Sequence, residues 1–91
     1  MKIEFDPDKD EANKDKHGVS LAFAATVMAD LHRVDILDLR FDYSEERWAV
    51  FGRVEGRVWI CVYTLRGETC RVISVRKAND RETKQYTRAQ A

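Results

Sequence analysis

Five side chains of this 91-residue chain are suited to acid–base chemistry on an anionic substrate. Arg76 and Arg71 carry guanidinium groups, whose planar forks can hold two oxygens of one phosphate or carboxylate. Glu46, His17 and Tyr86 can transfer protons, His17 near neutral pH. Each residue also has an ordinary structural role, such as an ion pair, a solvated carboxylate, a helix-end histidine or a packed aromatic ring. Spacing alone leaves both interpretations open.

The charges divide unevenly between the two halves of the chain. The 16 Lys and Arg residues balance 16 Asp and Glu residues, so the formal net charge is zero. Residues 1–46 nevertheless carry 6 basic and 12 acidic side chains, whereas residues 47–91 carry 10 basic and 4 acidic ones. The second half is therefore a candidate surface for an anion or a nucleic acid, unless folding mixes the two sets of charges.

Length and composition predict a single domain, residues 1–91, with a modest core. No apolar run approaches the roughly 20 residues of a membrane span, and the acidic N-terminus does not resemble a signal peptide, so we expect a cytoplasmic protein. Cys61 and Cys70 should then stay reduced. Two cysteines and two separated histidines do not form a zinc pattern, and we expect neither a metal nor a cofactor. The sequence also lacks a P-loop, a dinucleotide fingerprint and a nucleophile elbow.

The pattern of caps and apolar residues predicts three helices. Asp6 and Pro7 begin a charged helix that runs to about residue 16 and ends at Gly18. Ser20 caps a second, more apolar helix over residues 21–31. Asp80 caps a last helix from about residue 81 to residue 88.

Between the second and third helices, alternating apolar residues predict an antiparallel meander. Its four strands cover residues 34–41, 46–54, 57–65 and 68–76, and a short edge strand precedes the first helix near residues 3–5. The tight turns fall at Glu55-Gly56 and Arg66-Gly67. The fold class is thus α+β, with two N-terminal helices packed on the sheet.

These turns set the register and therefore the two faces of the sheet. Val62 should face Arg71, and Ile60 should face Ile73. Arg71 then points to the core face, unless a β-bulge reverses the parity. The core face comprises Ala49, Phe51, Val58, Ile60, Val62, Ile73 and Val75. It also includes Leu37, Leu39 and Phe41 if the loop between the first two strands of the meander has an odd number of residues. The outer face comprises Glu46, Trp48, Trp59, Tyr63, Ser74 and Arg76.

The aromatic residues of this outer face allow two interpretations. Trp48, Trp59 and Tyr63 can form a stacking platform for unpaired bases. They can equally be the floor on which the last helix or a protein partner lies. Because a large bare aromatic patch promotes association, we favour a covered face.

Several short motifs, in order and spread over nearly the whole chain, resemble the BrnT family. They are Phe5-Asp6-Pro7 with Lys9, Asn13, Lys16-His17-Gly18-Val19, Glu46-Arg47, Gly52, and Arg71 to Ala78 with Glu82 and Tyr86. The resemblance implies a RelE-like fold and a ribonuclease toxin that inhibits translation. It also implies a BrnA antitoxin with a ribbon-helix-helix part, which neutralises the toxin and, as a complex with it, binds operator DNA.

For such a ribonuclease the residues suggest a mechanism without a metal. A base helps the ribose 2′-OH attack the adjacent phosphate, cations stabilise the added negative charge, and an acid protonates the leaving 5′-oxygen. The candidate catalytic residues are Arg76, Arg71, Glu46, His17 and Tyr86. The candidate RNA-binding residues are Lys16, Arg47, Trp48, Trp59, Tyr63 and Lys77.

A second function remains open. The same fold can act as a catalytically weak binding module, a partner of an antitoxin-repressor. A pI of about 6.7 favours this alternative, because RNA contacts normally rest on an excess of Lys and Arg. A DNA-binding protein in its own right is less well supported, because the sequence shows no helix-turn-helix.

Overall fold

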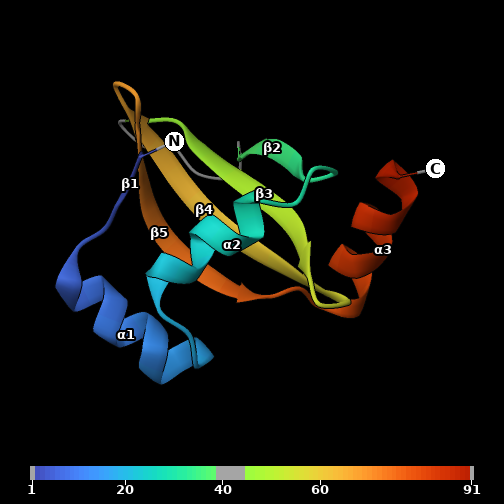
Figure 1. The fold of residues 1–91 in the computed structure, drawn as a ribbon, viewed down its shortest axis with the longest axis horizontal. Coiled ribbons are helices and arrows are strands. Elements are labelled where there is room, and N and C mark those ends of the chain that lie inside the picture. Colours follow the sequence, from blue (N-terminus) through green and yellow to red (C-terminus); the bar gives the residue numbers. More distant parts are fainter. Residues whose placement is uncertain (1, 39–44, 91) are drawn as a thin grey trace.

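The computed structural model describes residues 2–38 and 45–90 and has the expected α+β class, with a five-stranded mixed sheet (Figure 1). The strands lie in the order β1-β5-β4-β3-β2. Strands β2 to β5 pair antiparallel in sequence, and β1 adds parallel to β5, so the meander and the N-terminal edge strand are confirmed. The elements are β1 (Lys2–Glu4), α1 (Pro7–His17), the 3-10 turn η1 (Leu21–Phe23), α2 (Ala24–Met28), β2 (Val34–Asp38), β3 (Arg47–Val54), β4 (Arg57–Arg66), β5 (Thr69–Lys77) and α3 (Asp80–Ala89).

Helix α1 begins and ends where its caps predict. The Asp6 side chain accepts a hydrogen bond from the Asp8 N–H at 2.8 Å, and Pro7 occupies the first turn. Gly18 has φ +77°, and its N–H donates to the Lys14 carbonyl, which closes the helix. Only glycine adopts this left-handed cap without strain, so local chemistry alone fixes both ends.

The second helix is shorter than predicted and ends at Met28 rather than near residue 31. Ser20 caps it as expected, but its first turn is the 3-10 turn η1. The Asp30 carboxylate accepts from the N–H groups of His32 and Arg53, at 2.8 Å each. These bonds turn the chain toward β3, and they replace the helical ones that the apolar pattern predicted. Leu31 is left 95% exposed.

The β3–β4 turn confirms the predicted register on that side. Glu55 and Gly56 have φ +49° and +81°, as a type I′ turn requires, and Phe51 pairs with Ile60. The β4–β5 turn is displaced from its predicted place: Arg66 pairs with Thr69, and Gly67 takes the positive φ.

A β-bulge in β5 then changes the faces. Tyr63 pairs with Val72 but Val62 pairs with Ser74, so Ile73 is the extra residue. The predicted pairs of Val62 with Arg71 and of Ile60 with Ile73 are therefore wrong. The bulge allows Val72 and Val75 to lie on one face, while Ser74 points to the other.

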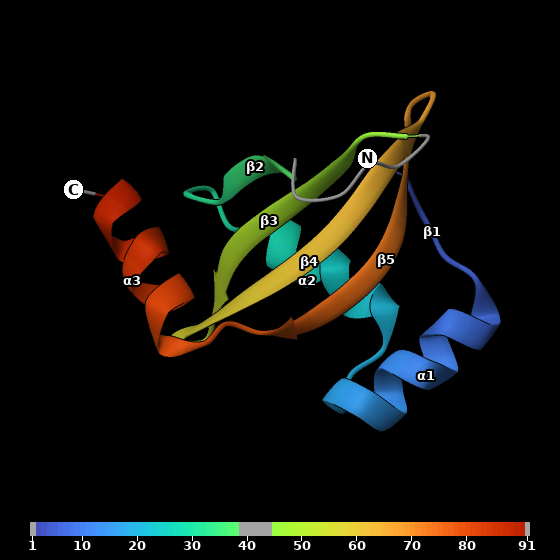
Figure 2. The same ribbon diagram turned by 180° about the vertical axis from the view of Figure 1, so that it is seen from behind.

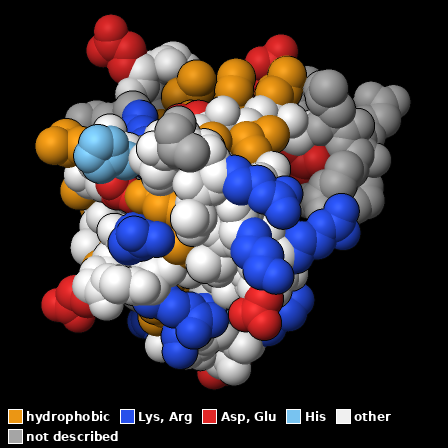
Figure 3. All heavy atoms as spheres, turned by 90° about the vertical axis from the view of Figure 1, so that its right-hand side faces the viewer, with side chains coloured by type: hydrophobic (Ala, Val, Ile, Leu, Met, Phe, Trp, Pro, Cys, Tyr) orange, Lys and Arg blue, Asp and Glu red, His pale blue; other side chains and the backbone are white. Residues whose placement is uncertain are grey.

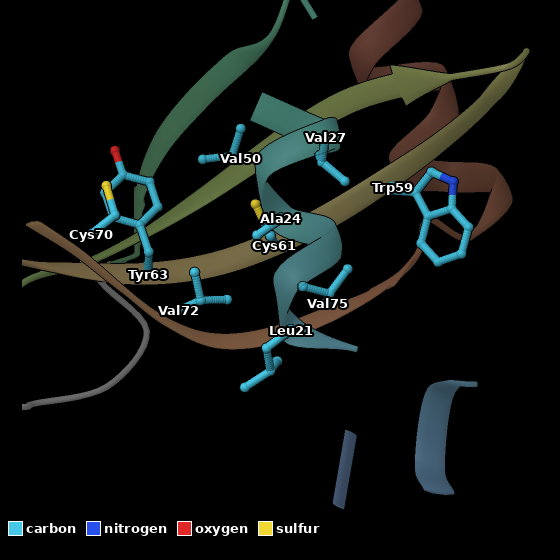
Figure 4. Packing of buried hydrophobic residues seen from close by; sticks show 10 residues of the cluster. All are labelled: Leu21, Ala24, Val27, Val50, Trp59, Cys61, Tyr63, Cys70, Val72 and Val75. Carbon is cyan, nitrogen blue, oxygen red and sulfur yellow. The ribbon is translucent and has the colours of Figure 1, made fainter. Parts of the chain in front are cut away.

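Helix α2 packs on the face that the register predicted to be exposed (Figures 1 and 4). Its contact with the strands is close because β3 has Gly52 there: a Cβ on Gly52 would lie 2.3 Å from the Val27 carbonyl oxygen. Trp59 and Tyr63 belong to this core and are 8% and 7% exposed. The cluster consists of Leu21, Ala24, Val27, Val50, Trp59, Cys61, Tyr63, Cys70, Val72 and Val75.

Helix α3 contacts the opposite face and stands at one end of the sheet (Figure 2). Its Tyr86 packs with Phe51, Val58, Ile60 and Ala78. Its N-cap is Asn79 rather than Asp80, and Glu82 completes a capping box.

The expected place of Leu37 is also wrong. Leu37 pairs with Trp48, whereas Ile36 pairs with Ala49 on the face of α3. Leu39 and Phe41 lie outside the described residues.

Both cysteines are free and buried. In the described part of the chain, the helices are too short or too polar to cross a bilayer.

Candidate active site

Arg76 lies where β5 meets the start of α3. Its two terminal nitrogens donate to the two oxygens of Glu82, each at 2.8 Å. Glu82 Oε1 also accepts from the N–H of Asn79, so the same carboxylate belongs to the capping box. The helix cap therefore fixes the plane of the guanidinium. Glu82 was part of the family resemblance, but spacing gave no reason to place it beside Arg76.

A groove of about 260 Å³ lies in front of this ion pair. Its polar wall includes Arg76, Glu82, Gln85 and Asp38, from three different elements. Its floor is the apolar sheet face, formed by Ile36, Ala49, Phe51, Ile60 and Val62. A hollow with an apolar floor and convergent polar groups suits a planar base whose phosphate reaches the arginine.

His17 and Lys16 reach the same part of β5 from the end of α1. Both line a second hollow together with Ser74. Two effects lower the pKa of His17 below its usual 6.5. Partial burial is the larger, and repulsion by the positive charges of Lys16 and Arg76 adds to it. The neutral imidazole is therefore favoured at pH 7 and can accept a proton. The structure thus places three of the predicted residues along one stretch of β5: Arg76 at the groove, and His17 and Lys16 at the hollow beside Ser74, two residues earlier in the strand.

The buried side chain of Asn13 holds α1 in this position. Its amide nitrogen donates to the carbonyls of Val75 (3.0 Å) and Val19 (2.9 Å), and its amide oxygen accepts from the Val75 N–H at 3.1 Å. The amide therefore replaces a neighbouring strand at the edge of β5, beyond the end of β1. Sequence reasoning took Asn13 only as part of a motif. The sequence feature that could have identified it is an uncharged amide within a helix of charged residues.

Asp10 makes the second polar anchor of α1. Its Oδ1 accepts from the Leu21 N–H at 2.7 Å and the Ser20 hydroxyl at 2.9 Å. The Leu21 hydrogen bond is the main cause of a lowered Asp10 pKa, and burial opposes it. Asp10 was not predicted.

Arg71 and Glu46 lie at the other end of the sheet. The Arg71 side chain forms an ion pair with Glu4 at 3.5 Å. In the sheet, Arg71 lies opposite Thr64 of β4, and the Thr64 hydroxyl donates to the Glu46 carbonyl. Five residues of extended strand separate Arg71 from Arg76, roughly 16 Å. Arg47, which pairs with Asp38, begins β3 beside Glu46. The structure does not gather these residues around Arg76.

The aromatic residues lie on a covered face, as favoured, but α2 covers it rather than the last helix or a protein partner. Trp59 and Tyr63 lie on the face opposite Arg76, which pairs with Ile60. The Phe23 ring packs edge-on against Trp59 at 4.8 Å, and the Lys77 ammonium lies 5.8 Å from its centroid. The Tyr63 hydroxyl donates to Asp35 at 3.2 Å. Trp48 is half-buried against the same core. Burial under α2 therefore removes the stacking surface.

Tyr86 is 3% exposed and anchors α3 to the rest of the fold. Its hydroxyl donates to Asp30 at 2.5 Å, and the Arg53 guanidinium lies 5.2 Å from the centre of its ring. Partial burial raises the pKa of Asp30, but hydrogen bonds from Tyr86 and from the N–H groups of Arg53 and His32 outweigh it and lower the pKa. Asp30, which sequence reasoning missed, thus ties α2, β3 and α3 together.

The comparisons with known proteins bear on the whole chain. No curated protein matches it in sequence. Residues 5–82, most of the 91, match the family model described as the ribonuclease toxin BrnT of type II toxin–antitoxin systems. The matched segment runs from Phe5, before α1, to Glu82, which holds Arg76. The chain therefore belongs to the BrnT family of ribonuclease toxins.

Proposed function

We propose that this protein is a metal-independent endoribonuclease toxin with a RelE-like fold, which cleaves RNA in the cytoplasm and so inhibits translation. A BrnA-type antitoxin would neutralise it, and operator DNA would be bound only through that complex. The observation that carries the proposal is the oriented guanidinium of Arg76 at the groove, with the neutral imidazole of His17 and the ammonium of Lys16 nearby. Family membership supports the same activity.

The proposed reaction uses the RNA's own 2′-hydroxyl. His17 takes its proton, the O2′–P bond forms, and Arg76 with Lys16 stabilises the charge that builds on the phosphorane oxygens. The P–O5′ bond then breaks, and a proton from solvent completes departure of the 5′-oxygen. The products are a 2′,3′-cyclic phosphate and a 5′-hydroxyl.

Glu82 acts in this scheme as a positioning residue. Its bidentate pair holds Arg76 in one plane before RNA binds, which reduces the cost of orientation during the reaction. The isosteric Glu82→Gln variant keeps the capping-box acceptor but loses the charge. It should lower kcat more than it raises KM, with little change in melting temperature. Asp80→Asn, on the same helix turn, is the matched control and should leave kcat unchanged.

The decisive experiment is cleavage of single-stranded RNA by the purified chain, with EDTA present. Arg76→Lys keeps the charge but loses the fork, and should lower kcat by roughly 10²–10³. His17→Gln should lower it by roughly 10²–10⁴ and should remove the acidic limb of the pH–rate profile. Cyclic-phosphate ends on the products, together with activity in EDTA, would support the mechanism.

The alternative function is a catalytically weak partner of an antitoxin-repressor, and the same experiment separates the two. Well-folded protein that leaves RNA intact, and whose expression does not slow bacterial growth, would favour the binding module and contradict the toxin. Toxicity that survives both Arg76→Lys and His17→Gln would keep the function but refute this site. Co-expression with a ribbon-helix-helix partner should restore growth if the antitoxin is of the BrnA type.

A further inference from the structure

The outward side of α3 carries three cations that the proposed catalytic site does not use. Arg81, Lys84 and Arg88 are exposed and recur at helical spacing, within an arc of about 60° of the helix surface. The inward side of α3 is formed by Glu82, which binds Arg76, and by buried Tyr86. The helix is therefore divided between an attached side and a basic side.

Two arginines of the β3–β4 hairpin lie next to this helix. Arg53 stacks over the Tyr86 ring at 5.2 Å, and Arg57 donates to the Ala78 carbonyl just before α3, at 3.2 Å. Figure 3, which looks onto the end of the molecule that carries α3, shows Lys and Arg side chains gathered there. We call these residues the α3 basic surface: Arg53, Arg57, Arg81, Lys84 and Arg88.

The cations of the α3 basic surface have no carboxylate partner among the described residues, unlike five of the cations elsewhere on the molecule. Lys14, Arg33, Arg66, Arg71 and Arg76 are all engaged in ion pairs. Within residues 2–38 and 45–90, no carboxylate lies within 4.0 Å of the cations of the α3 basic surface. Concentrated cations without a carboxylate to neutralise them attract an external anion.

The surface also continues directly from the groove at Arg76. Gln85 lines that groove, and on α3 it lies beside Lys84 and one turn from Arg81 and Arg88. From Arg81 to Arg88 the helix rises about 10 Å, so a bound strand that leaves the groove over Gln85 meets one cation after another.

We propose that the α3 basic surface docks the phosphate backbone of single-stranded RNA beyond the scissile bond. This inference rests on the proposed ribonuclease function and adds a second, sequence-independent contact to it. It also explains how a chain of zero net charge can hold RNA: residues 47–91 carry only 4 acidic side chains against 10 basic ones, and one of the four, Glu82, is paired with Arg76.

The test compares two charge-matched triple variants of the full chain. Arg81→Gln/Lys84→Gln/Arg88→Gln removes three charges from the α3 basic surface. The control, Lys2→Gln/Lys14→Gln/Arg66→Gln, removes three exposed charges elsewhere. Binding is measured by fluorescence anisotropy on labelled RNA with every ribose 2′-O-methylated, which prevents cleavage. Thermal melts confirm that each variant is folded.

Each lost phosphate contact should lower the salt slope of log K by about 0.7. The α3 variant should therefore lose about 2 from the slope, so that its affinity deficit shrinks roughly 20-fold between about 50 and 200 mM salt. The control should keep the wild-type slope. Equal slopes in the two variants would overturn the proposal, and so would unchanged RNA binding with lost antitoxin binding.

Cleavage of a dinucleotide separates this inference from the proposed function. A dinucleotide is short enough to fill the groove without reaching Arg81, Lys84 or Arg88, so the α3 variant should cleave it at the wild-type rate, whereas Arg76→Lys should not. Absence of cleavage by the wild-type protein would refute the proposed function, and the 2′-O-methyl RNA would still test the surface. Intact dinucleotide cleavage with no change in salt slope would refute the surface alone.

Discussion

Substituting Gly52 by alanine tests the packing on which the whole arrangement rests. Helix α2 crosses β3 so closely that a Cβ on Gly52 would lie 2.3 Å from the carbonyl oxygen of Val27 and 2.9 Å from its Cγ1. Ordinary van der Waals contact begins at 3.4 Å. The nearer obstacle is backbone, so no rotamer change can relieve it, and α2 must move away from the sheet by about 1 Å.

The expected cost lies at the upper end of overpacking, about 3 kcal/mol, because the displaced helix carries Leu21, Ala24 and Val27 of the core. For a domain of this size that loss lowers the melting temperature by roughly 12–24 °C. Urea denaturation and thermal melts of Gly52→Ala and the wild-type protein measure it. Because α2 covers the face opposite Arg76, residual RNA cleavage by the folded fraction should persist.

Two controls make the reasoning refutable. Gly56→Ala meets nothing within 4 Å but has φ +81°, so it should cost only about 1–2 kcal/mol of backbone strain. Val27→Ala removes the Cγ1 contact and leaves the carbonyl, so it should not rescue Gly52→Ala. If Gly52→Ala were as stable as Gly56→Ala, or were rescued by Val27→Ala, the backbone contact would not be the determinant.

Three further predictions concern buried polar groups. Tyr86→Phe removes the 2.5 Å hydrogen bond to Asp30 and should cost about 1.5–3 kcal/mol at pH 7. Folding lowers the pKa of Asp30, so the stability that the ionised carboxylate contributes is complete above the unfolded pKa of 3.8 and is lost as pH falls through the folded pKa. The urea midpoints of the wild-type protein and the variant should therefore converge in acid. Asn13→Leu leaves the buried N–H and C=O of Val75 without their partner and should cost about 2–4 kcal/mol, with faster hydrogen exchange at the Val75 amide; unchanged exchange would contradict the edge-cap role. Burial raises the pKa of Cys61 to about 12, so a thiol reagent at pH 8 should modify it only on unfolding, and rapid modification of the native protein would show that the core is open there.

The zero net charge of the sequence has a different meaning in the folded protein. Carboxylates engage Lys14, Arg33, Arg66, Arg71 and Arg76 in ion pairs. The cations of the α3 basic surface have no such partner among the described residues. Local charge, rather than the sum over the chain, therefore governs which side of the molecule attracts an anion.

The sequence by itself determined the features that depend on neighbouring residues. Helix α1 has the caps that Asp6 and Gly18 predict, the Glu55-Gly56 turn fixes the β3–β4 register, and the alternation of apolar residues gives the meander. The motifs spread along the chain gave the family, which the match over residues 5–82 confirms. Such features rest on interactions within a few residues, which a linear pattern records directly.

Only the tertiary structure decided which face of the sheet α2 covers. Both faces are apolar enough to be a core, and a single bulged residue, Ile73, changes which side chains share a face. The backbone contact at Gly52 brings α2 to the side of Trp59, and Arg76 is left on the other side.

The same holds for the polar anchors of the candidate site. The Asn13 amide meets Val75, and Asp30 meets Tyr86, across 62 and 56 residues of sequence. The Glu82 carboxylate reaches back to Arg76 only because β5 ends beside its helix cap. Such pairs form when separate elements pack, and no spacing along the chain encodes them, so the sequence identified the chemical groups and the fold selected which of them act together.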